Sequence, residues 1–320
     1  ISSFAKYEIA GEGAEAFLGR VLAGRLPALG RISLCPMLNE RGKLIGDFTL
    51  ARLAPERFML TGSGIAEGYH LRWLEQHLPS TGVTLRSVTN ERLGLSIAGP
   101  ASRAILQTLT DADLTSESFP FLAMREIEID LVPALVGRIT YTGDLGYEIW
   151  VDAAYLRRLF TSLRRAGQPF GLQLFGARAL NSLRLEKSFG SWAREFRPLY
   201  GPAEAGLDVF VDYQRGGFIG HEAARAEREA GPERRLVALV VDDAGVDVMG
   251  DEPIWHDGAV VGWVTSGGYA HCSQASVALG YVPAALADAA GFEVEILGER
   301  RPARVAPSPL FDPDGRRMRD

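Results

Sequence analysis

Two acidic residues stand where the surrounding sequence favours a buried strand. Glu148 follows the aromatic Tyr147 within an otherwise apolar run, and Asp47 begins another apolar run. A carboxylate on a largely buried strand is costly unless polar groups satisfy it. Glu148 therefore either faces water through the alternation of a strand or accepts paired N–H donors from a planar, polar ligand. For Asp47 alone, a turn or surface acid is the alternative to a site residue.

The segments around these residues predict the elements that position them. In residues 138–151, two β-prone runs flank Thr142–Gly146, whose glycines can supply positive φ, so we predict a hairpin or a tight strand-turn-strand. Residues 37–50 predict a second strand-turn-strand with Asp47 at the start of a strand. Residues 175–187 predict a helix, since Leu180 and Leu183 share a face.

Composition narrows the class of protein. A chain of 320 residues exceeds what one core usually serves, so two or three subdomains are expected. Hydrophobic content of 47% and charged content of 23% are typical of a soluble globular protein. The net charge of −6, without a basic stripe, argues against a nucleic-acid partner. No apolar run reaches membrane-spanning length, so we expect no transmembrane helix and no membrane partner.

The cysteines and histidines indicate no metal site. The count of two cysteines excludes a disulfide framework. Cys35 and Cys272 are far apart and lack a second cluster of ligands, which argues against zinc. His70 and His77 are seven residues apart, and we expect both at the surface or at an interface. With no signal peptide visible, a reducing compartment and a cytoplasmic location are expected. Because Ile1 starts what resembles the inside of a strand, we also expect the chain to be cut from a longer one.

The pattern changes after Asp212. Short strands and turns follow, with hairpin turns expected at residues 250–253 and at Asp257-Gly258. We predict a C-terminal β-barrel domain at residues 213–320. Residues 1–212 would form the first region, with a lobe at about 44–98 built from alternating strands and one amphipathic helix.

Five segments in order carry a family resemblance. The sequence resembles the glycine-cleavage T-protein (aminomethyltransferase) superfamily, which binds tetrahydrofolate, and more closely the folate-binding C-terminal half of dimethylglycine and sarcosine dehydrogenases. The resemblance spans essentially the whole chain and implies an α+β, three-lobed aminomethyltransferase-like fold with folate in a central channel and a C-terminal β-barrel domain. The segments are Ile1–Tyr7, Met37–Glu40, Tyr141–Glu148, Leu183–Lys187 and Thr265–Tyr269.

The resemblance also implies roles for individual residues. Asp47 matches a family aspartate that contacts folate at N10, and Thr49 is a further candidate beside it. Glu148 matches a glutamate that binds the pterin edge. Tyr141 matches a tyrosine that lines the pterin pocket, with an ordinary core aromatic as the alternative. Arg178 matches an arginine that could bind the carboxylate end of folate or buttress Glu148, with a structural ion pair as the alternative.

The sequence departs from the family pattern at three places. The loop after Lys187 reads Trp192–Glu195 and then Gly201-Pro202, where the family usually carries an aspartate and then Thr-Pro. Gly46 stands where glycine-cleavage proteins often have a second aspartate. Gly217 replaces the cysteine that marks an iron–sulfur assembly branch, which argues against that branch.

The function implied by the resemblance is tetrahydrofolate-dependent one-carbon transfer. The C1 unit would come from an oxidised N-methyl amine such as dimethylglycine or sarcosine and would give 5,10-methylenetetrahydrofolate. The partners implied are folate, the small-molecule C1 donor and a flavin oxidoreductase unit, upstream or separate, and FAD would belong only to such an upstream region. Two alternatives remain: a folate-dependent O-, S- or N-demethylase that transfers methyl directly, and a non-catalytic scaffold that ignores folate.

Overall fold

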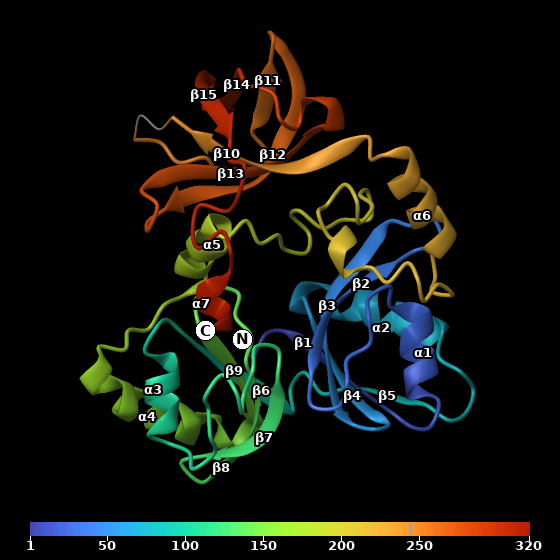
Figure 1. Cartoon of the computed structure of the whole chain (residues 1–320), viewed down its shortest axis with the longest axis vertical. Helices are drawn as coiled ribbons and strands as arrows, with labels where there is room; N and C mark the ends of the chain where they lie inside the picture. Colours follow the sequence, from blue (N-terminus) through green and yellow to red (C-terminus); the bar gives the residue numbers. More distant parts are fainter. Residues whose placement is uncertain (243–244) are drawn as a thin grey trace.

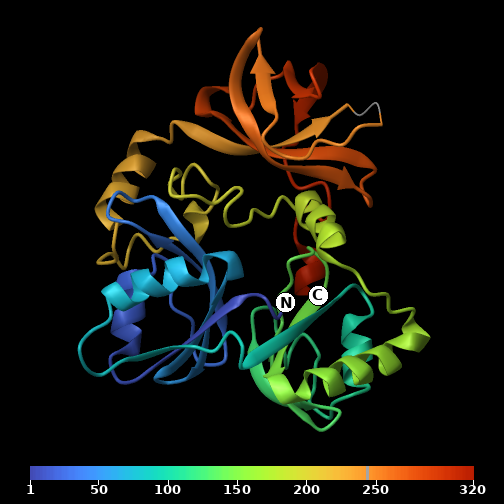
Figure 2. The same ribbon diagram turned by 180° about the vertical axis from the view of Figure 1, so that it is seen from behind.

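The computed structural model describes residues 1–242 and 245–320, which form three lobes with separate hydrophobic cores. Two lobes each hold an antiparallel sheet, and the third is a closed barrel. Figures 1 and 2 show the barrel at the top and the two sheet lobes side by side below it, with α5 between the barrel and the second lobe. The predicted α+β class and C-terminal barrel are confirmed.

The first lobe is a five-stranded sheet covered on one face by helices. Its strand order is β2-β3-β4-β1-β5. The core under the helices takes Phe48 and Leu50 from β3 and Phe17 and Leu18 from α1. The elements are β1 (Ala5–Ala10), α1 (Ala14–Val21), β2 (Ile32–Leu38), β3 (Leu44–Ala54), β4 (Arg57–Gly62), η1 (Gly64–Ala66), α2 (Glu67–Gln76) and β5 (Thr84–Ser87).

The second lobe repeats this layered plan with four strands in the order β6-β9-β8-β7. Tyr147, Ile149 and Val151 alternate along β9 and pack into the core under α3 and α4. The elements are β6 (Arg92–Ala98), α3 (Ser102–Gln107), β7 (Met124–Ile129), β8 (Val132–Gly137), β9 (Gly146–Asp152), η2 (Ala153–Tyr155), α4 (Leu156–Gly167) and η3 (Gln168–Phe170).

The third lobe is a closed six-stranded barrel in the order β10-β13-β12-β11-β14-β15. Asp257 and Gly258 join β11 to β12 with φ of 49° and 76°, as a two-residue hairpin turn requires. The barrel elements are β10 (Arg234–Val241), β11 (Pro253–His256), β12 (Ala259–Ala270), β13 (Ala275–Pro283), η5 (Ala284–Leu286), β14 (Phe292–Ile296) and β15 (Glu299–Val305). The connecting and terminal elements are α5 (Ala177–Glu186), η4 (Asp208–Phe210), α6 (His221–Ala230) and α7 (Arg316–Arg319).

The predicted ranges divide the chain differently from the sheets. The sheets group strands from residues 5–87 and from residues 92–152, whereas the predicted lobe at about 44–98 takes strands from both. The predicted division after residue 212 falls between η4 and α6, and the first barrel strand begins at Arg234. The ranges 1–212 and 213–320 thus stay a prediction about domain organisation.

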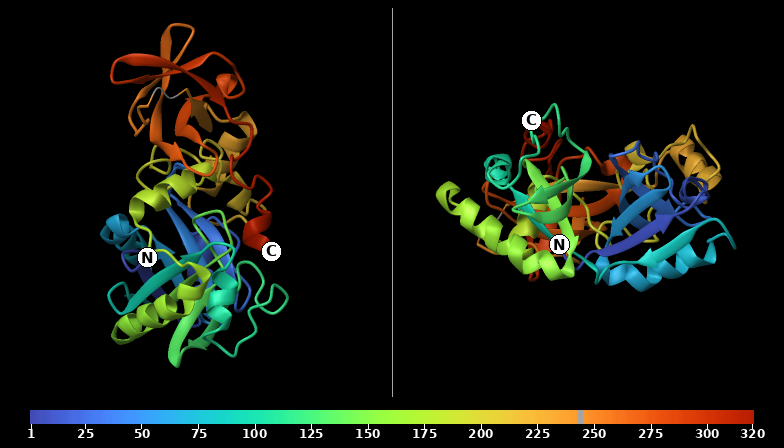
Figure 3. Two further views of the ribbon diagram at one scale, coloured as in Figure 1. Left: turned by 90° about the vertical axis from the view of Figure 1, so that its left-hand side faces the viewer. Right: turned by 90° about the horizontal axis from the view of Figure 1, so that it is seen from below.

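The two sheets face each other through a shared apolar cluster. Ala51 and Met59 come from the first sheet, and Leu135 and Trp150 from the second. Within the second sheet, Gly94 on β6 lies directly opposite Trp150 on β9 and leaves room for its ring, because a Cβ there would lie 2.4 Å from that ring. The faces turned away from the helices therefore meet, and Thr49 and Glu148, two positions before Ala51 and Trp150 on their strands, lie on these facing sides. Figure 3 shows the two termini emerging on opposite sides of the molecule.

No helix in the part of the chain that the structure describes is long and apolar enough to cross a membrane.

Candidate functional site

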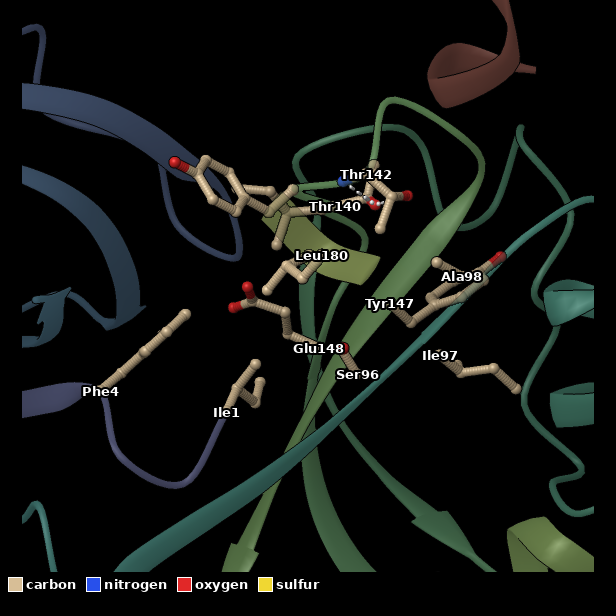
Figure 4. Close-up of a pocket in the computed structure, with 12 residues that line it drawn as sticks. Ile1, Phe4, Ser96, Ile97, Ala98, Thr140, Thr142, Tyr147, Glu148 and Leu180 are labelled. Carbon is tan, nitrogen blue, oxygen red and sulfur yellow. Dashed lines mark hydrogen bonds between the residues drawn. The ribbon is translucent and has the colours of Figure 1, made fainter. Parts of the chain in front are cut away.

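Glu148 lies on the face of β9 that is turned toward the first lobe. Tyr147 and Ile149 pack into the core of the second lobe, so Glu148 shares the opposite face with Trp150. Figure 4 shows its carboxylate directed into a space bordered by Ile1, Phe4 and Leu180. The cavity volume there is about 20 Å³.

The Glu148 carboxylate is half-buried and accepts no hydrogen bond from the residues described here. Burial raises its pKa from 4.5 to about 7. An acidic group held in a mostly apolar pocket without donors is suited to accept N–H groups from a ligand. The pocket is lined by Ile1, Phe4, Ser96, Ile97, Ala98, Ile139, Thr140, Tyr141, Thr142, Tyr147, Glu148 and Leu180.

Tyr141 lines the same pocket from the connection between β8 and β9. Its ring stacks on Phe189, with centroids 6.0 Å apart and 15° between the planes. Its hydroxyl donates to the carbonyl oxygen of Gly190 at 2.5 Å. Burial raises the pKa of Tyr141, and the negative charges of Asp47 and Glu195 raise it further. Tyr141 therefore lies within electrostatic reach of Asp47 and of Glu195.

Asp47 faces this region from the opposite sheet. Phe48 and Leu50 point into the first core, so Asp47 and Thr49 share the other face of β3 with Ala51. One carboxylate oxygen, Oδ1, is buried and has no hydrogen-bond partner among the described residues. Burial raises the pKa of Asp47 to about 7, and Glu195 contributes in the same direction.

Arg178 is exposed near the start of α5, two residues before the pocket residue Leu180. The structure gives its guanidinium no hydrogen bond and no ion pair among the residues it describes. In this arrangement Arg178 does not buttress Glu148. The structure thus brings Glu148 and Tyr141 into one pocket, sets Asp47 and Thr49 on the facing strand, and leaves Arg178 at the outer end of α5.

Glu195 is a residue that the sequence did not single out. It is fully buried, and its carboxylate accepts hydrogen bonds from the hydroxyls of Thr265 and Ser266, both at 2.6 Å. Arg184 pairs with it at 3.3 Å. These partners lie 70 and 71 residues later and 11 residues earlier, so no local pattern marks them. The signal available was a glutamate placed between Trp192 and Phe196 in an aromatic loop.

Two local predictions hold only in part. β8 and β9 pair antiparallel, as the predicted hairpin requires, but residues 138–145 form a longer, irregular connection instead of a tight turn. Within it the hydroxyls of Thr140 and Thr142 are hydrogen-bonded at 2.8 Å. The sequence predicts His70 at the surface or at an interface. It is fully buried, which excludes the surface position, and it lies where Phe48 of its own lobe and Trp192 of a distant segment pack against its ring, with centroids 4.7 and 5.1 Å away.

Comparisons with known proteins agree with this architecture. The model of the GCVT N-terminal domain matches residues 1–215, and that of the glycine cleavage T-protein C-terminal barrel domain matches residues 234–312. The chain therefore belongs to the glycine cleavage T-protein family.

Relatives and a solved structure support the assignment. The mitochondrial dimethylglycine dehydrogenase of Rattus norvegicus is 37% identical over 97% of this chain, which spans 37% of that protein's length. An aminomethyltransferase of Shouchella clausii is 33% identical over 86% of this chain and 75% of its own length. The crystal structure of the glycine cleavage system aminomethyltransferase T from Bartonella henselae superposes with a TM-score of 0.87, at 26% identity, over 98% of this chain and 85% of that one.

Proposed function

We propose that this chain binds tetrahydrofolate between its first two lobes and transfers a one-carbon unit to it. The observation that carries the proposal is a pair of largely buried carboxylates on two sheets: Glu148 lines the pocket, and Asp47 lies within electrostatic reach of Tyr141, which lines the same pocket. The carboxylate of Glu148 and one oxygen of Asp47 lack a donor among the described residues. A flat ligand with N–H donors at one edge and an amine further along would satisfy both.

Glu148 would recognise the pterin. When ionised, its two oxygens accept two neighbouring N–H groups in one plane, as carboxylates do with other planar donors. The aromatic and aliphatic residues around it, Tyr141, Phe4 and Leu180, would cover the faces of the ring and exclude water. Ionisation of Glu148 is thus the condition for binding.

Asp47 would handle a proton at the reacting amine. Its pKa of about 7 is suited to accepting and returning a proton near neutral pH. Its unpartnered oxygen can orient the amine, and its negative charge can stabilise a cation that develops beside it. Thr49, two residues along the same strand face, would border this position. Arg178, exposed at the start of α5, would bind the carboxylate end of folate.

The C1 donor would be an N-methyl amine, such as dimethylglycine or sarcosine, that a flavin unit has oxidised to its iminium. This finer proposal is supported by the similarity to dimethylglycine dehydrogenase over 97% of the chain. The iminium carbon would lose its bonds to the amine nitrogen and gain bonds to N5 and N10 of folate. Of the two protons released by those nitrogens, one goes to the amine and one to solvent, and the product is 5,10-methylenetetrahydrofolate.

The experiment is calorimetric titration of the chain with 5-formyltetrahydrofolate, repeated with Glu148→Ala. We expect micromolar binding that is lost in the variant. Glu128→Gln is the control, because Glu128 is exposed on β7 of the same lobe. No heat from a folded wild-type chain would reject the folate site and favour the scaffold function. In the full protein, methyl rather than methylene on the folate product would favour the demethylase.

A further inference from the structure

Residues 188–196, here called the central loop, contact all three lobes. The carbonyl oxygen of Gly190 accepts a hydrogen bond of 2.5 Å from the hydroxyl of Tyr141, which belongs to the second lobe. Trp192 stacks on Tyr69 of the first lobe, with centroids 6.2 Å apart. Glu195 bonds Thr265 of the barrel at 2.6 Å. A single short segment thus connects elements that lie far apart in the sequence.

Glu195 is the anchor of the central loop in the barrel. One carboxylate oxygen accepts the hydroxyls of Thr265 and Ser266, both at 2.6 Å, and the other accepts the backbone N–H of Ser191 at 2.9 Å. Arg184 on α5 pairs with Glu195 and also donates to the carbonyl of Phe189 at 2.9 Å. Because these bonds hold the loop near both ends, its conformation depends on the Glu195 carboxylate.

On the first lobe, the loop touches the neighbours of Asp47. The Trp192 ring lies 5.1 Å from the His70 ring, which in turn lies 4.7 Å from Phe48. Phe48 follows Asp47 on β3. A Cβ at Gly46, on the other side of Asp47, would lie 3.3 Å from Nε2 of His70. A displacement of Trp192 would therefore reach the strand that holds Asp47 through one intervening ring.

On the second lobe, the loop determines the position of Tyr141. Phe189 stacks on its ring and Gly190 accepts its hydroxyl, so both ends of the side chain are held by the loop. Tyr141 lines the pocket of Glu148. The loop therefore contacts the surroundings of both candidate carboxylates: those of Asp47 in the first lobe and those of Glu148 in the second.

We propose that Glu195 is a positioning residue of the site. By anchoring the central loop in the barrel, it fixes the position of Tyr141 in the second lobe relative to the strand of the first lobe that holds Asp47. Its value for function rests on the proposed folate activity. The charge of Glu195 also acts on Asp47. Burial is the largest cause of the raised pKa of Asp47, and the negative charge of Glu195 raises this pKa further.

The first test measures Asp47 without folate. The carboxyl carbon of Asp47, assigned with Asp47→Asn, is titrated by ¹³C NMR in the wild type and in Glu195→Gln. Removing the negative charge leaves Arg184 uncompensated nearby, so the titration midpoint of Asp47 should move to lower pH. An unchanged midpoint in a folded variant would overturn the electrostatic half of the inference.

The second test keeps every charge and removes one hydroxyl group. Thr265→Val deletes the hydroxyl that donates to Glu195 and to the carbonyl oxygen of Leu279, and preserves the side-chain shape, whereas Thr265→Ser keeps the hydroxyl. We expect the dissociation constant for 5-formyltetrahydrofolate to rise at least threefold in the valine variant and to stay within twofold in the serine variant. Thr161→Val, exposed on α4, is the matched control.

The outcomes separate this inference from the proposed function. If the folded wild type does not bind folate, the proposed function fails, and the NMR midpoint alone decides the role of Glu195. If folate binds equally well to wild type, Thr265→Val and Thr265→Ser, the positioning role is refuted and the network is merely structural. If Glu195→Gln does not fold, the valine and serine pair decides.

Discussion

Replacing Glu148 by glutamine should weaken folate binding and at the same time stabilise the folded protein. The isosteric amide keeps one acceptor oxygen but loses the charge. A hydrogen bond to a charged group contributes about 1.5–3 kcal/mol, so the dissociation constant for 5-formyltetrahydrofolate should rise about 10- to 150-fold. In the wild type, binding should be about tenfold weaker at pH 6 than at pH 8, because Glu148 with a pKa of about 7 is mostly protonated at pH 6.

The stability change follows from the same burial. Folding raises the pKa of Glu148 from 4.5 to about 7, so the folded state holds the proton more tightly than the unfolded chain does. The ionised form of Glu148 therefore lowers the free energy of unfolding by its full amount above pH 7. This loss of stability shrinks as the pH falls and is absent below pH 4.5. The pKa difference corresponds to about 3 kcal/mol. Because the carboxylate is partly exposed, we expect Glu148→Gln to gain about 1–3 kcal/mol at pH 8.

Urea denaturation at pH 8 and pH 5.5 measures this gain. It should fall to less than half of its pH 8 value at pH 5.5, where the unfolded carboxylate is ionised and the folded one is largely protonated. Glu128→Gln, exposed in the same lobe, should show neither a gain nor a change in folate binding. A Glu148→Gln protein that is less stable than the wild type at pH 8 would refute the assignment of Glu148 as a desolvated ligand-binding carboxylate.

Three further predictions test the site and the packing around it. Asp47→Asn should lower the rate of one-carbon transfer to tetrahydrofolate in the full protein by at least about 100-fold, and an unchanged rate would exclude Asp47 from proton handling. Trp150→Ala should cost about 3–5 kcal/mol in urea denaturation, whereas Phe170→Ala, already 43% exposed, should stay within about 0.5 kcal/mol; equal losses would contradict the packing of the two sheets through Trp150. Gly94→Ala should cost about 1–3 kcal/mol, because its Cβ would lie 2.4 Å from the Trp150 ring. Gly68→Ala, with nothing within 4 Å, should cost nothing, and a harmless Gly94→Ala would show that the Trp150 ring does not lie against Gly94 in the second sheet.

Local patterns allowed the fold class and several elements to be predicted. Alternation of apolar residues identified the strands, and Asp257-Gly258 identified a hairpin turn, because both depend on residues adjacent in the sequence. The family resemblance supplied the three-lobed architecture and the candidate roles of Asp47 and Glu148. The environment of those residues was not accessible, since burial, the missing donors and the raised pKa values depend on contacts between lobes.

The surface position that the sequence left open for His70 failed for a tertiary reason. On its own helix His70 can be read as a surface or interface residue, but Trp192, 122 positions later, covers its ring. The local sequence around His70 does not contain that group.

The sequence by itself determined which segments become strands and helices, which face of each is apolar, and which acidic residues interrupt those faces. Only the tertiary structure decided that the interrupted faces of two sheets meet, so that Asp47 lies within electrostatic reach of Tyr141, which lines the pocket of Glu148. It also decided that Glu195, unremarkable in its own segment, is buried where three lobes converge. Periodicity acts over a few residues, whereas desolvation and charge coupling act through space between residues that may be a hundred positions apart.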